Sequence, residues 1–302
     1  MSAAYEQVFA AMGTVVAVRV VHDGSEAAAR DAVARAGAWF DDVERACSRF
    51  DAASELRQLC AAPTQTPVAV SPILAQAVAF AVDVAKGTNG AFDPTVGATM
   101  ERRGFDSDYR TGARGASGVA EAATTWRDVH VDPEAGTITL DRALLLDLGG
   151  VAKGLAIDLA ARELAGFAGF AIDAGGDLRV AGVNASGAPW TIGVRNPREL
   201  AQHAVVLTAT DVAVCTSGDY ERRDALGGHH LIDPRTGEPA ADVASATVVA
   251  PTAIVADALA TAAFTLGPQA GIALLESHGV EGLIIDASLA FHETPGFGAL
   301  IR

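Results

Sequence analysis

Hydrophobic residues follow two different spacings along this chain, one typical of strands and one typical of helices. Short runs rich in β-branched residues predict strands at residues 15–21, 212–215, 245–249 and 283–286. Apolar positions spaced three and four residues apart predict helices at residues 25–47, 71–86, 153–165 and 252–264. Ser71 followed by Pro72 is a typical helix start, and Gly267 is a typical residue to end the last of these helices.

Turn signals connect several of the strands directly. Residues 133–136 (PEAG) lie between two short β-rich segments and predict a hairpin, and residues 170–194 read as strand, glycine-rich turn and strand. The apolar run at 144–148 is interpreted as a further strand, and the polar, glycine-rich residues 101–125 as a loop. Because hairpins are frequent and strict strand–helix alternation is missing, we predict an α+β fold with mixed or antiparallel sheets flanked by helices. No linker or repeat interrupts the pattern, so residues 1–302 are interpreted as a single domain.

The composition is that of a globular protein with a strongly acidic surface. Half of the residues are hydrophobic, and the formal net charge is −15. Such a surface repels phosphate backbones and no run of Lys or Arg offsets it, which argues against a nucleic-acid partner. No apolar stretch is long enough for a membrane span. The three cysteines have no metal-ligand spacing and fit reduced thiols, so we expect a cytoplasmic protein.

A glycine pair marks the first candidate site, at residues 146–154 (LDLGGVAKG). An apolar run followed by Gly149, Gly150 and a helix start would turn backbone N–H groups and the helix dipole toward an anion. Lys153, in the first turn of the predicted helix, adds a positive charge. The spacing matches neither a Walker phosphate loop nor the dinucleotide-binding glycine motif. A plain glycine-rich turn is the alternative interpretation.

An acid and a hydroxyl share one face of a predicted helix at residues 256–262 (ADALATA). Asp257 and Thr261 are four residues apart, so their oxygens lie about one turn from each other among apolar neighbours. Two oxygen donors in this setting suit a hard cation such as Mg²⁺. In the alternative interpretation, Asp257 caps another element and Thr261 hydrogen-bonds its own backbone.

Two further clusters combine glycines with acids. Residues 90–97 (GAFDPTVG) taken alone favour a turn capped by Asp93, with a ligand contact as the other interpretation. In residues 172–178 (IDAGGDL), Gly175 and Gly176 permit positive φ angles and close approach of the backbone to a planar ligand. A tight hairpin explains the second cluster almost as well.

The last cluster holds the candidate general base. Residues 215–222 (CTSGDYER) include Ser217, and residues 229–237 (HHLIDPRTG) include a histidine pair. His230 lies near Asp233 in sequence and is a candidate general base oriented by local groups. Because no third His or Cys stands at ligand spacing, a zinc site is not expected.

Together and in this order, these clusters resemble the ApbE family of FAD:protein FMN transferases. The resemblance begins at residues 12–14 (MGT), continues through 48–50 (SRF) and 54–56 (SEL), and spans roughly residues 9–267. The combination of DLGGVAKG, TSGDYERR, HHLIDPRTG and ADALAT is its most specific part. The sequence departs from the family pattern at Asp173, where Asn is usual, and at Ala98, where Pro is frequent. Asp173 places an extra negative charge near one expected flavin contact.

The resemblance implies a set of site residues. It implies a Mg²⁺ ion bound by Asp257, Thr261 and the backbone carbonyl of Gly150. The family's base before the Ile-Asp-Pro motif corresponds to His230. The positions implied to bind FAD are Met12, Phe50, Ala91, Phe92, Asp93, Asp147, Lys153, Leu231 and Ile232. From the clusters above we add three further FAD-binding candidates, Gly175, Gly176 and Ser217.

The implied reaction is Mg²⁺-dependent transfer of the FMN half of FAD to a Ser or Thr hydroxyl of an acceptor protein, with release of AMP. Asp257 and Thr261 would hold the ion, Lys153 would add positive charge at the pyrophosphate, and His230 would accept the proton of the hydroxyl. The residues alone leave two alternatives open. One is hydrolysis of FAD to FMN and AMP at the same site, and the other is an FAD-binding carrier without chemistry.

Overall fold

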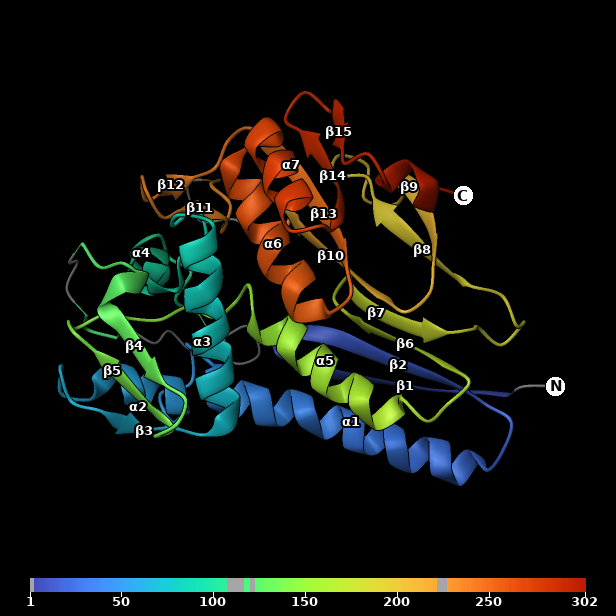
Figure 1. Ribbon diagram of the computed structural model, residues 1–302, viewed down its shortest axis with the longest axis horizontal. Helices are drawn as coiled ribbons and strands as arrows, with labels where there is room; N and C mark the ends of the chain where they lie inside the picture. Colours follow the sequence, from blue (N-terminus) through green and yellow to red (C-terminus); the bar gives the residue numbers. More distant parts are fainter. Residues whose placement is uncertain (1–2, 108–116, 120–122, 222–226) are drawn as a thin grey trace.

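A long antiparallel sheet is the frame of the molecule in the computed structural model, which describes residues 3–107, 117–119, 123–221 and 227–302 (Figure 1). Its eight strands follow the order β1-β2-β6-β7-β10-β13-β14-β15, and every neighbouring pair is antiparallel. The strands of this sheet are β1 (Ala3–Ala11), β2 (Thr14–His22), β6 (Gly169–Ala174), β7 (Asp177–Gly182), β10 (Val212–Gly218), β13 (Val243–Ala250), β14 (Glu281–Asp286) and β15 (Phe291–Glu293). The predicted α+β class is confirmed.

Three smaller sheets complete the strand inventory of the described residues. A three-stranded sheet has the order β3-β5-β4, and two two-stranded sheets are formed by β8 with β9 and by β11 with β12. Their strands are β3 (Val68–Ala69), β4 (Val129–Asp132), β5 (Thr137–Leu140), β8 (Trp190–Arg195), β9 (His203–Ala209), β11 (Ile232–Asp233) and β12 (Glu238–Pro239).

Helices cover one face of the large sheet, and a β-hairpin covers part of the other (Figure 1). The helices are α1 (Glu26–Cys47), α2 (Glu55–Ala61), α3 (Pro72–Gly87), α4 (Gly97–Arg102), α5 (Ala152–Leu164), α6 (Ala253–Leu266) and α7 (Pro268–Ser277), with short 3₁₀ turns η1 (Pro94–Val96), η2 (Trp126–Asp128) and η3 (Phe297–Leu300). On the opposite face, β8 and β9 bury Trp190, Ile192 and Leu207 in a second apolar cluster.

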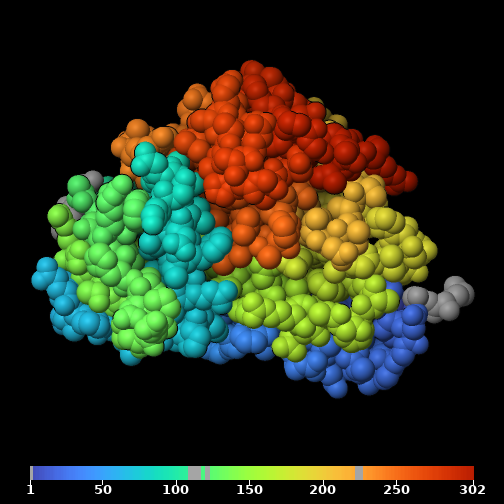
Figure 2. Space-filling model, viewed as in Figure 1, coloured from blue at the N-terminus to red at the C-terminus, as the bar shows by residue number. Residues whose placement is uncertain are grey.

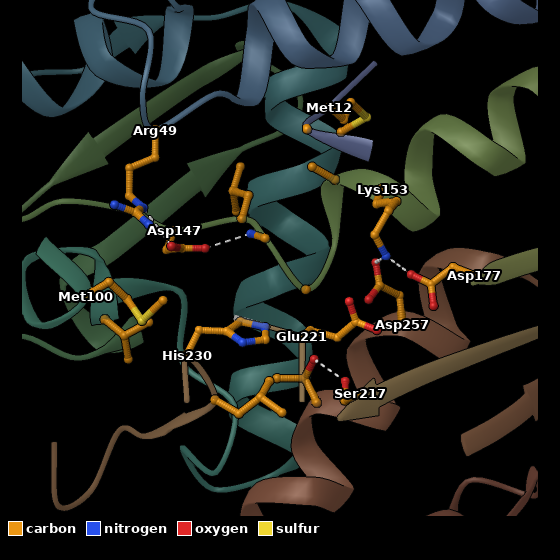
Figure 3. Close-up of a pocket in the computed structure, with 18 of the residues that line it drawn as sticks. Met12, Arg49, Met100, Asp147, Lys153, Asp177, Ser217, Glu221, His230 and Asp257 are labelled. Atoms are coloured by element: carbon orange, nitrogen blue, oxygen red, sulfur yellow. Dashed lines mark hydrogen bonds and ion pairs between the residues drawn. The ribbon is translucent and has the colours of Figure 1, made fainter. Parts of the chain in front are cut away.

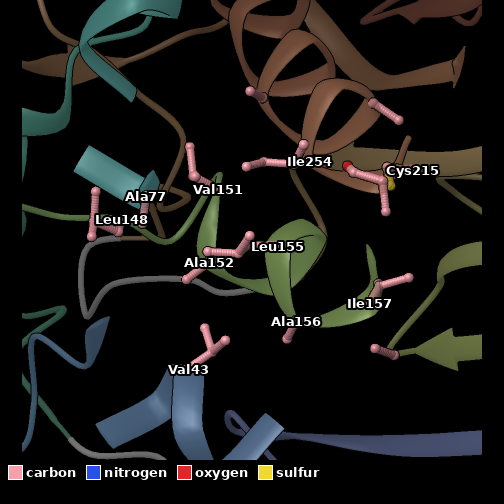
Figure 4. Packing of buried hydrophobic residues seen from close by; sticks show 14 of the residues in the cluster. Val43, Ala77, Leu148, Val151, Ala152, Leu155, Ala156, Ile157, Cys215 and Ile254 are labelled. Carbon is pink, nitrogen blue, oxygen red and sulfur yellow. The ribbon is translucent and has the colours of Figure 1, made fainter. Parts of the chain in front are cut away.

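The core is centred on α5, which lies between α1 and α6 (Figure 4). Val43 of α1 and Ile254 of α6 reach toward α5 from opposite sides, and Leu155 is 1 % exposed between them. In the space-filling view, the side chains of α3, α5 and α6 lie against one another along this face (Figure 2). Two distant sequence segments, at residues 146–154 and 256–262, are thereby brought into contact.

Gly154 allows α5 and α6 to approach this closely. A Cβ atom built at Gly154 would lie 2.5 Å from the carbonyl oxygen of Ala253 and 2.6 Å from Cα of Ile254. No side chain fits in that space, so any other residue would push the start of α6 away from α5. At the same point, Asp158 of α5 accepts the N–H groups of Ala253 and Ile254, each at 2.9 Å, and so caps α6.

A two-residue turn places Met12 at the end of the sheet. Ala11 pairs with Thr14, and the residues between them, Met12 and Gly13, have φ angles of 49° and 73°. Positive φ at both central residues matches the right-handed twist of a hairpin, and glycine adopts it without strain.

The structure corrects two sequence interpretations and extends others. Residues 144–148 are an extended segment outside any sheet, bound through Gly97 N–H to the carbonyl of Leu145 and Asp147 N–H to the carbonyl of Pro94. Its apolar side chains are buried against helices, so hydrophobicity alone suggested a strand. The predicted loop at 101–125 begins inside α4, and its residues 108–116 and 120–122 lie outside the described residues. Ser71 caps α3 as predicted, accepting Leu74 N–H at 3.2 Å.

None of the helices in the described ranges combines the length and the apolarity needed to cross a membrane.

Candidate active site

One cavity of about 420 Å³ gathers residues from both ends of the chain. Its volume lies in the range of small-molecule sites, and its walls come from the β1–β2 turn, the start of α5, the end of β10 and one face of α6 (Figure 3). The predicted site residues that line it are Met12, Phe50, Ala91, Phe92, Asp93, Asp147, Gly150, Lys153, Gly175, Ser217, His230, Leu231, Ile232, Asp257 and Thr261. Residues predicted from separate clusters are therefore neighbours in space.

Gly176 is the predicted site residue that does not line the cavity. It has a φ angle of 96°, and its N–H donates to Oδ1 of Asp173 at 2.9 Å. Gly175 does line the cavity, and a Cβ built there would collide with the hydroxyl of Thr14. The glycine pair thus forms the tight β6–β7 turn that was the alternative interpretation, and only its first residue also faces the cavity.

Three charged side chains meet where α5 crosses α6. Lys153, in the first turn of α5, forms an ion pair with Asp177 at the start of β7. Its Nζ atom also lies 3.8 Å from Oδ2 of Asp257 on α6 (Figure 3). Lys153 therefore stands between two carboxylates, one of which sequence analysis had not assigned to the site.

Asp257 is buried and uses only part of its hydrogen-bonding capacity. It is 5 % exposed, and its Oδ2 atom accepts the N–H of Gly154 at 3.1 Å. Among the described residues, no donor hydrogen-bonds Oδ1 of Asp257. Burial raises the pKa of this carboxyl, while the ammonium group of Lys153 and the Gly154 N–H act in the opposite direction.

The Gly150 carbonyl, just before α5, is also open. Gly154 is the third residue of α5, so its N–H is one of the first-turn donors without a partner inside the helix, and Asp257 accepts it. No backbone N–H of the described residues donates to the Gly150 carbonyl. A Cβ at Gly150 would lie 3.0 Å from Oγ1 of Thr261, so glycine lets the backbone come close to that hydroxyl.

These groups fit a hard divalent cation. Gly150, Asp257 and Thr261 offer a carbonyl, a carboxylate and a hydroxyl on adjoining elements, and Ser217 Oγ lies 3.2 Å from Thr261 Oγ1. Oxygen donors of these three types are what Mg²⁺ prefers. In the part of the chain that the structure describes, no group of three His, Cys, Asp or Glu residues is arranged for a metal. The donor set therefore favours an oxygen-bound cation over zinc.

The anion cradle expected at Gly149 and Gly150 is only partly available. Gly149 N–H donates to Oδ1 of Asp147, and the N–H groups of Val151 and Ala152 donate to the carbonyl of Leu148. With Gly154 N–H bound to Asp257, most of the expected donors are occupied. Positive charge for an anion at this wall comes mainly from Lys153.

The opposite wall is built around Arg49. Its Nε atom donates to Oδ2 of Asp147 at 2.7 Å, with side chains 5 % and 15 % exposed. The Arg49 guanidinium lies 4.3 Å from the ring centroid of Phe50, a cation–π distance. Arg49 thus fixes two residues that the family resemblance implies in FAD binding. The motif at residues 48–50 was noted in the sequence, but no role was given to its arginine.

Asp93 is held entirely by local donors. Its carboxylate accepts Thr95 N–H at 2.9 Å, the Thr95 hydroxyl at 2.8 Å and Trp126 N–H at 3.1 Å. Burial raises its pKa, and the hydrogen bonds from Thr95 and Trp126 partly offset that shift. The capped-turn interpretation of residues 90–97 describes what this carboxylate does, although Asp93 also lines the cavity.

His230 lines the cavity beside the ring of Phe105, with centroids 6.3 Å apart in an edge-to-face arrangement. The neighbouring acid has another partner, because Asp233 binds Nε and Nη2 of Arg235 at 2.8 Å each. Burial alone would raise the pKa of Asp233, but the hydrogen bonds from Arg235 lower it. His229, by contrast, faces the protein interior, where its Nε2 atom lies 2.7 Å from the Ala240 carbonyl.

Sequence analysis missed Asp177 as a site residue, although it lies in the cluster at 172–178. It is 3 % exposed, lines the cavity and pairs with Lys153. The sequence analysis gave the cluster's ligand contact to Gly175 and Gly176, and the lysine that pairs with Asp177 is 24 positions away. An acid directly after a glycine pair at a strand start was the available signal.

Comparison with known proteins identifies the family of the chain. The model of the ApbE family matches residues 12–284. The FAD:protein FMN transferase of Haemophilus influenzae is 30% identical over 290 residues, covering 91% of this chain and 84% of that protein. The enzyme of the same name from Treponema pallidum is 34% identical over 307 residues, covering 93% and 84%.

Solved structures show the same fold. The ApbE protein of Thermotoga maritima superposes with a TM-score of 0.88 at 30% identity, covering 99% of this chain and 100% of that one. The flavin transferase ApbE from Vibrio cholerae superposes with a TM-score of 0.85 at 27% identity, with the same coverage. The family match over residues 12–284, the relatives and the shared fold show that the chain belongs to the ApbE family.

Proposed function

We propose that this protein transfers the FMN half of FAD to a Ser or Thr hydroxyl of an acceptor protein and releases AMP, with Mg²⁺ as cofactor. One observation carries the proposal: the α5–α6 crossing places the open Gly150 carbonyl, Oδ1 of Asp257 and the Thr261 hydroxyl beside Lys153 in one cavity. Asp257 and Gly150 line the cavity, and Asp257 Oδ1 and the Gly150 carbonyl accept no hydrogen bond from the described residues, so both oxygens are available to a cation. The names of the relatives support the reaction class.

In this proposal the wall of α5 and α6 binds the pyrophosphate. Asp257, Thr261 and the Gly150 carbonyl would hold Mg²⁺, which would supply positive charge to the phosphate oxygens as the bond breaks. Lys153 adds a second positive charge, fixed in place by its ion pair with Asp177. Phe50, stacked on Arg49, contributes an aromatic surface in the same cavity.

His230 is proposed as the base. It accepts the proton of the acceptor hydroxyl as that oxygen forms a bond to the FMN phosphorus. The bond between this phosphorus and the bridging oxygen breaks, and AMP leaves with both electrons of that bond. The products are a phosphoester-linked FMN on the acceptor and AMP, so no atom is unaccounted for.

The test is incubation of the protein with FAD, Mg²⁺ and an acceptor protein that carries a Ser or Thr flavinylation site. We expect the intact mass of the acceptor to rise by one FMN phosphoryl adduct, with one AMP released per adduct. Omission of Mg²⁺ should abolish both signals.

The same experiment separates the two alternatives left open by the residues. Free FMN and AMP without an adduct would identify a hydrolase that uses water at this site. Bound FAD without AMP would identify a carrier. Either result would overturn the proposed transfer.

A further inference from the structure

Asp177 and Asp257 flank the same lysine, but they differ in how many of their carboxylate oxygens already have a partner. Oδ1 of Asp177 accepts Thr216 N–H at 3.1 Å, and Oδ2 pairs with Lys153. Both oxygens of Asp177 are therefore engaged. Asp257 accepts one N–H through Oδ2, and its Oδ1 has no donor among the described residues.

We propose that Asp177 is a positioning residue, which holds the Lys153 ammonium group away from Asp257 and so keeps the Asp257 carboxylate available to a divalent cation. The proposal rests on the metal site of the proposed function. Asp177 itself is not a metal ligand in this assignment, because both of its carboxylate oxygens already have a partner.

Charge and geometry make such a residue necessary. Lys153 projects from the first turn of α5, and Asp257 accepts the N–H of the very next residue, Gly154. The ammonium group is thus tethered next to Asp257, at 3.8 Å from its Oδ2. Without a competing anion, a largely buried lysine moves to the nearest carboxylate, because an unpaired buried charge is strongly unfavourable. In that position Lys153 would compete with a metal ion for the same ligand.

Asp177 is well placed to prevent this competition. It is 3 % exposed at the start of β7, where its Oδ1 is anchored to the backbone of β10. The ion pair with Lys153 is consequently directed toward the start of β7. A lysine and a divalent cation can then stand side by side at one phosphate site.

The test is a double-mutant cycle that measures binding of Mn²⁺, as a probe for Mg²⁺, without FAD. Asp177→Asn keeps an oxygen that can accept Thr216 N–H and removes only the charge. We expect Asp177→Asn to weaken Mn²⁺ binding roughly tenfold in the chain with Lys153. In a Lys153→Met background, where there is no ammonium group to hold, the same change should alter Mn²⁺ affinity by less than about twofold. Calorimetry and the electron paramagnetic resonance of free Mn²⁺ both report this affinity.

Asp173→Asn is the matched control. Asp173 lies in the same β6–β7 hairpin, loses the same charge and binds Gly176 N–H rather than Lys153. We expect its Mn²⁺ affinity to stay within about twofold of the original chain. An equal loss in Asp173→Asn and Asp177→Asn would show a general charge effect and overturn the proposal.

Two other results would also overturn it. Equal effects of Asp177→Asn with and without the Lys153→Met substitution would show that Asp177 acts directly on the metal. A crystal structure of the Asp177→Asn variant in which the Lys153 ammonium group has not moved closer to Asp257 than 3.8 Å would do the same. This measurement remains decisive if the variants that carry Lys153→Met fail to fold. If the double-mutant cycle gives the expected Mn²⁺ affinities but the protein does not transfer FMN, the proposed reaction is overturned. The positioning role of Asp177 is then still supported.

Discussion

Two walls of one cavity use their acids in different ways. In the α5–α6 wall, formed by Gly150, Lys153, Asp257 and Thr261, one carboxylate oxygen and one carbonyl have no donors among the described residues. In the opposite wall, Asp93 accepts three hydrogen bonds from its own neighbourhood.

Asp147, also in the opposite wall, is bound by Arg49 and by Gly149 N–H. The contrast separates acids that hold the structure from an acid with spare capacity for a ligand. Lining a cavity is therefore not enough to identify a metal ligand. The unused hydrogen-bonding capacity is the better guide, because a carboxylate oxygen that already accepts several hydrogen bonds has little capacity left for a metal ion.

The largest effect is expected from a substitution in the α5–α6 wall. Asp257→Ala removes the carboxylate proposed to hold the cation, and we expect the rate of FMN transfer to fall about 10³-fold. Mass spectrometry of the acceptor over time gives the rate, and circular dichroism checks that the variant is folded. Transfer near the original rate at limiting Mg²⁺ would contradict the metal assignment.

The next prediction concerns the opposite wall and stability rather than rate. Arg49→Met removes the charged hydrogen bond from Arg49 to the largely buried Asp147 carboxylate, and we expect the free energy of unfolding to fall by about 2 kcal/mol. Denaturant unfolding measures this change. Mn²⁺ affinity should remain within about twofold, because the α5–α6 wall is untouched. A variant as stable as the original chain would remove the structural role given to this pair.

Thr261→Val sharpens the comparison within the α5–α6 wall. The substitution keeps the side-chain shape and removes the hydroxyl, so we expect Mn²⁺ affinity to fall roughly tenfold. Thr261→Ser, which keeps the hydroxyl, is the matched control and should bind Mn²⁺ within about twofold of the original chain. Similar affinities of the Val and Ser variants would exclude the Thr261 hydroxyl as a ligand.

The smallest effect is expected at Asp93. Asp93→Asn replaces one accepting oxygen by an amide group, and we expect a loss of about 1 kcal/mol in the free energy of unfolding at neutral pH. Denaturant unfolding of the variant and the original chain, side by side, measures the difference. A variant as stable as the original chain would show that the local donors to Asp93 do not need a carboxylate.

The raised pKa of Asp93 also determines the direction in which stability changes with pH. Burial raises the pKa of Asp93 in the folded protein, so the protonated carboxyl is favoured on folding. Its contribution to stability is full below the ordinary Asp pKa of about 3.9 and is lost as pH rises through the folded pKa. The stability difference between the original chain and Asp93→Asn should therefore move in favour of the original chain as pH falls from neutrality toward that ordinary pKa. A difference that is constant with pH would contradict the raised pKa.

Much of the fold follows from short-range patterns. The apolar spacing of residues 25–47 predicts α1, and the Ser71–Pro72 pair predicts the start of α3. The sequence-based predictions failed where contacts between residues distant in sequence determine the local structure. The run at 144–148 has a strand-like composition, but its backbone pairs with the Pro94–Gly97 segment instead of a sheet. Helices α2, α4 and α7 and strands β1, β3, β9, β11, β12 and β15 were not predicted.

At the candidate site, the roles of the glycines were likewise only partly predictable from the sequence. Gly149 and Gly150 suggested an anion cradle because free N–H groups are expected at a helix start. Which of those donors remain free depends on α6, since Asp257 takes the N–H of Gly154. Gly154 itself was part of the motif, but its role in the close approach of two helices is visible only once both are placed.

The sequence by itself determined the residue types and their local order: an acid and a hydroxyl one helical turn apart, a lysine after a glycine pair, and the motifs that match the ApbE family. These depend on neighbours a few positions away, which periodicity and capping rules describe well. The tertiary structure decided which groups are satisfied and which are not. Lys153 is matched with Asp177, Arg49 with Asp147, and Asp257 with a single N–H, through contacts across 24 to 103 positions. Such pairings follow from packing of the whole core, which no local pattern contains.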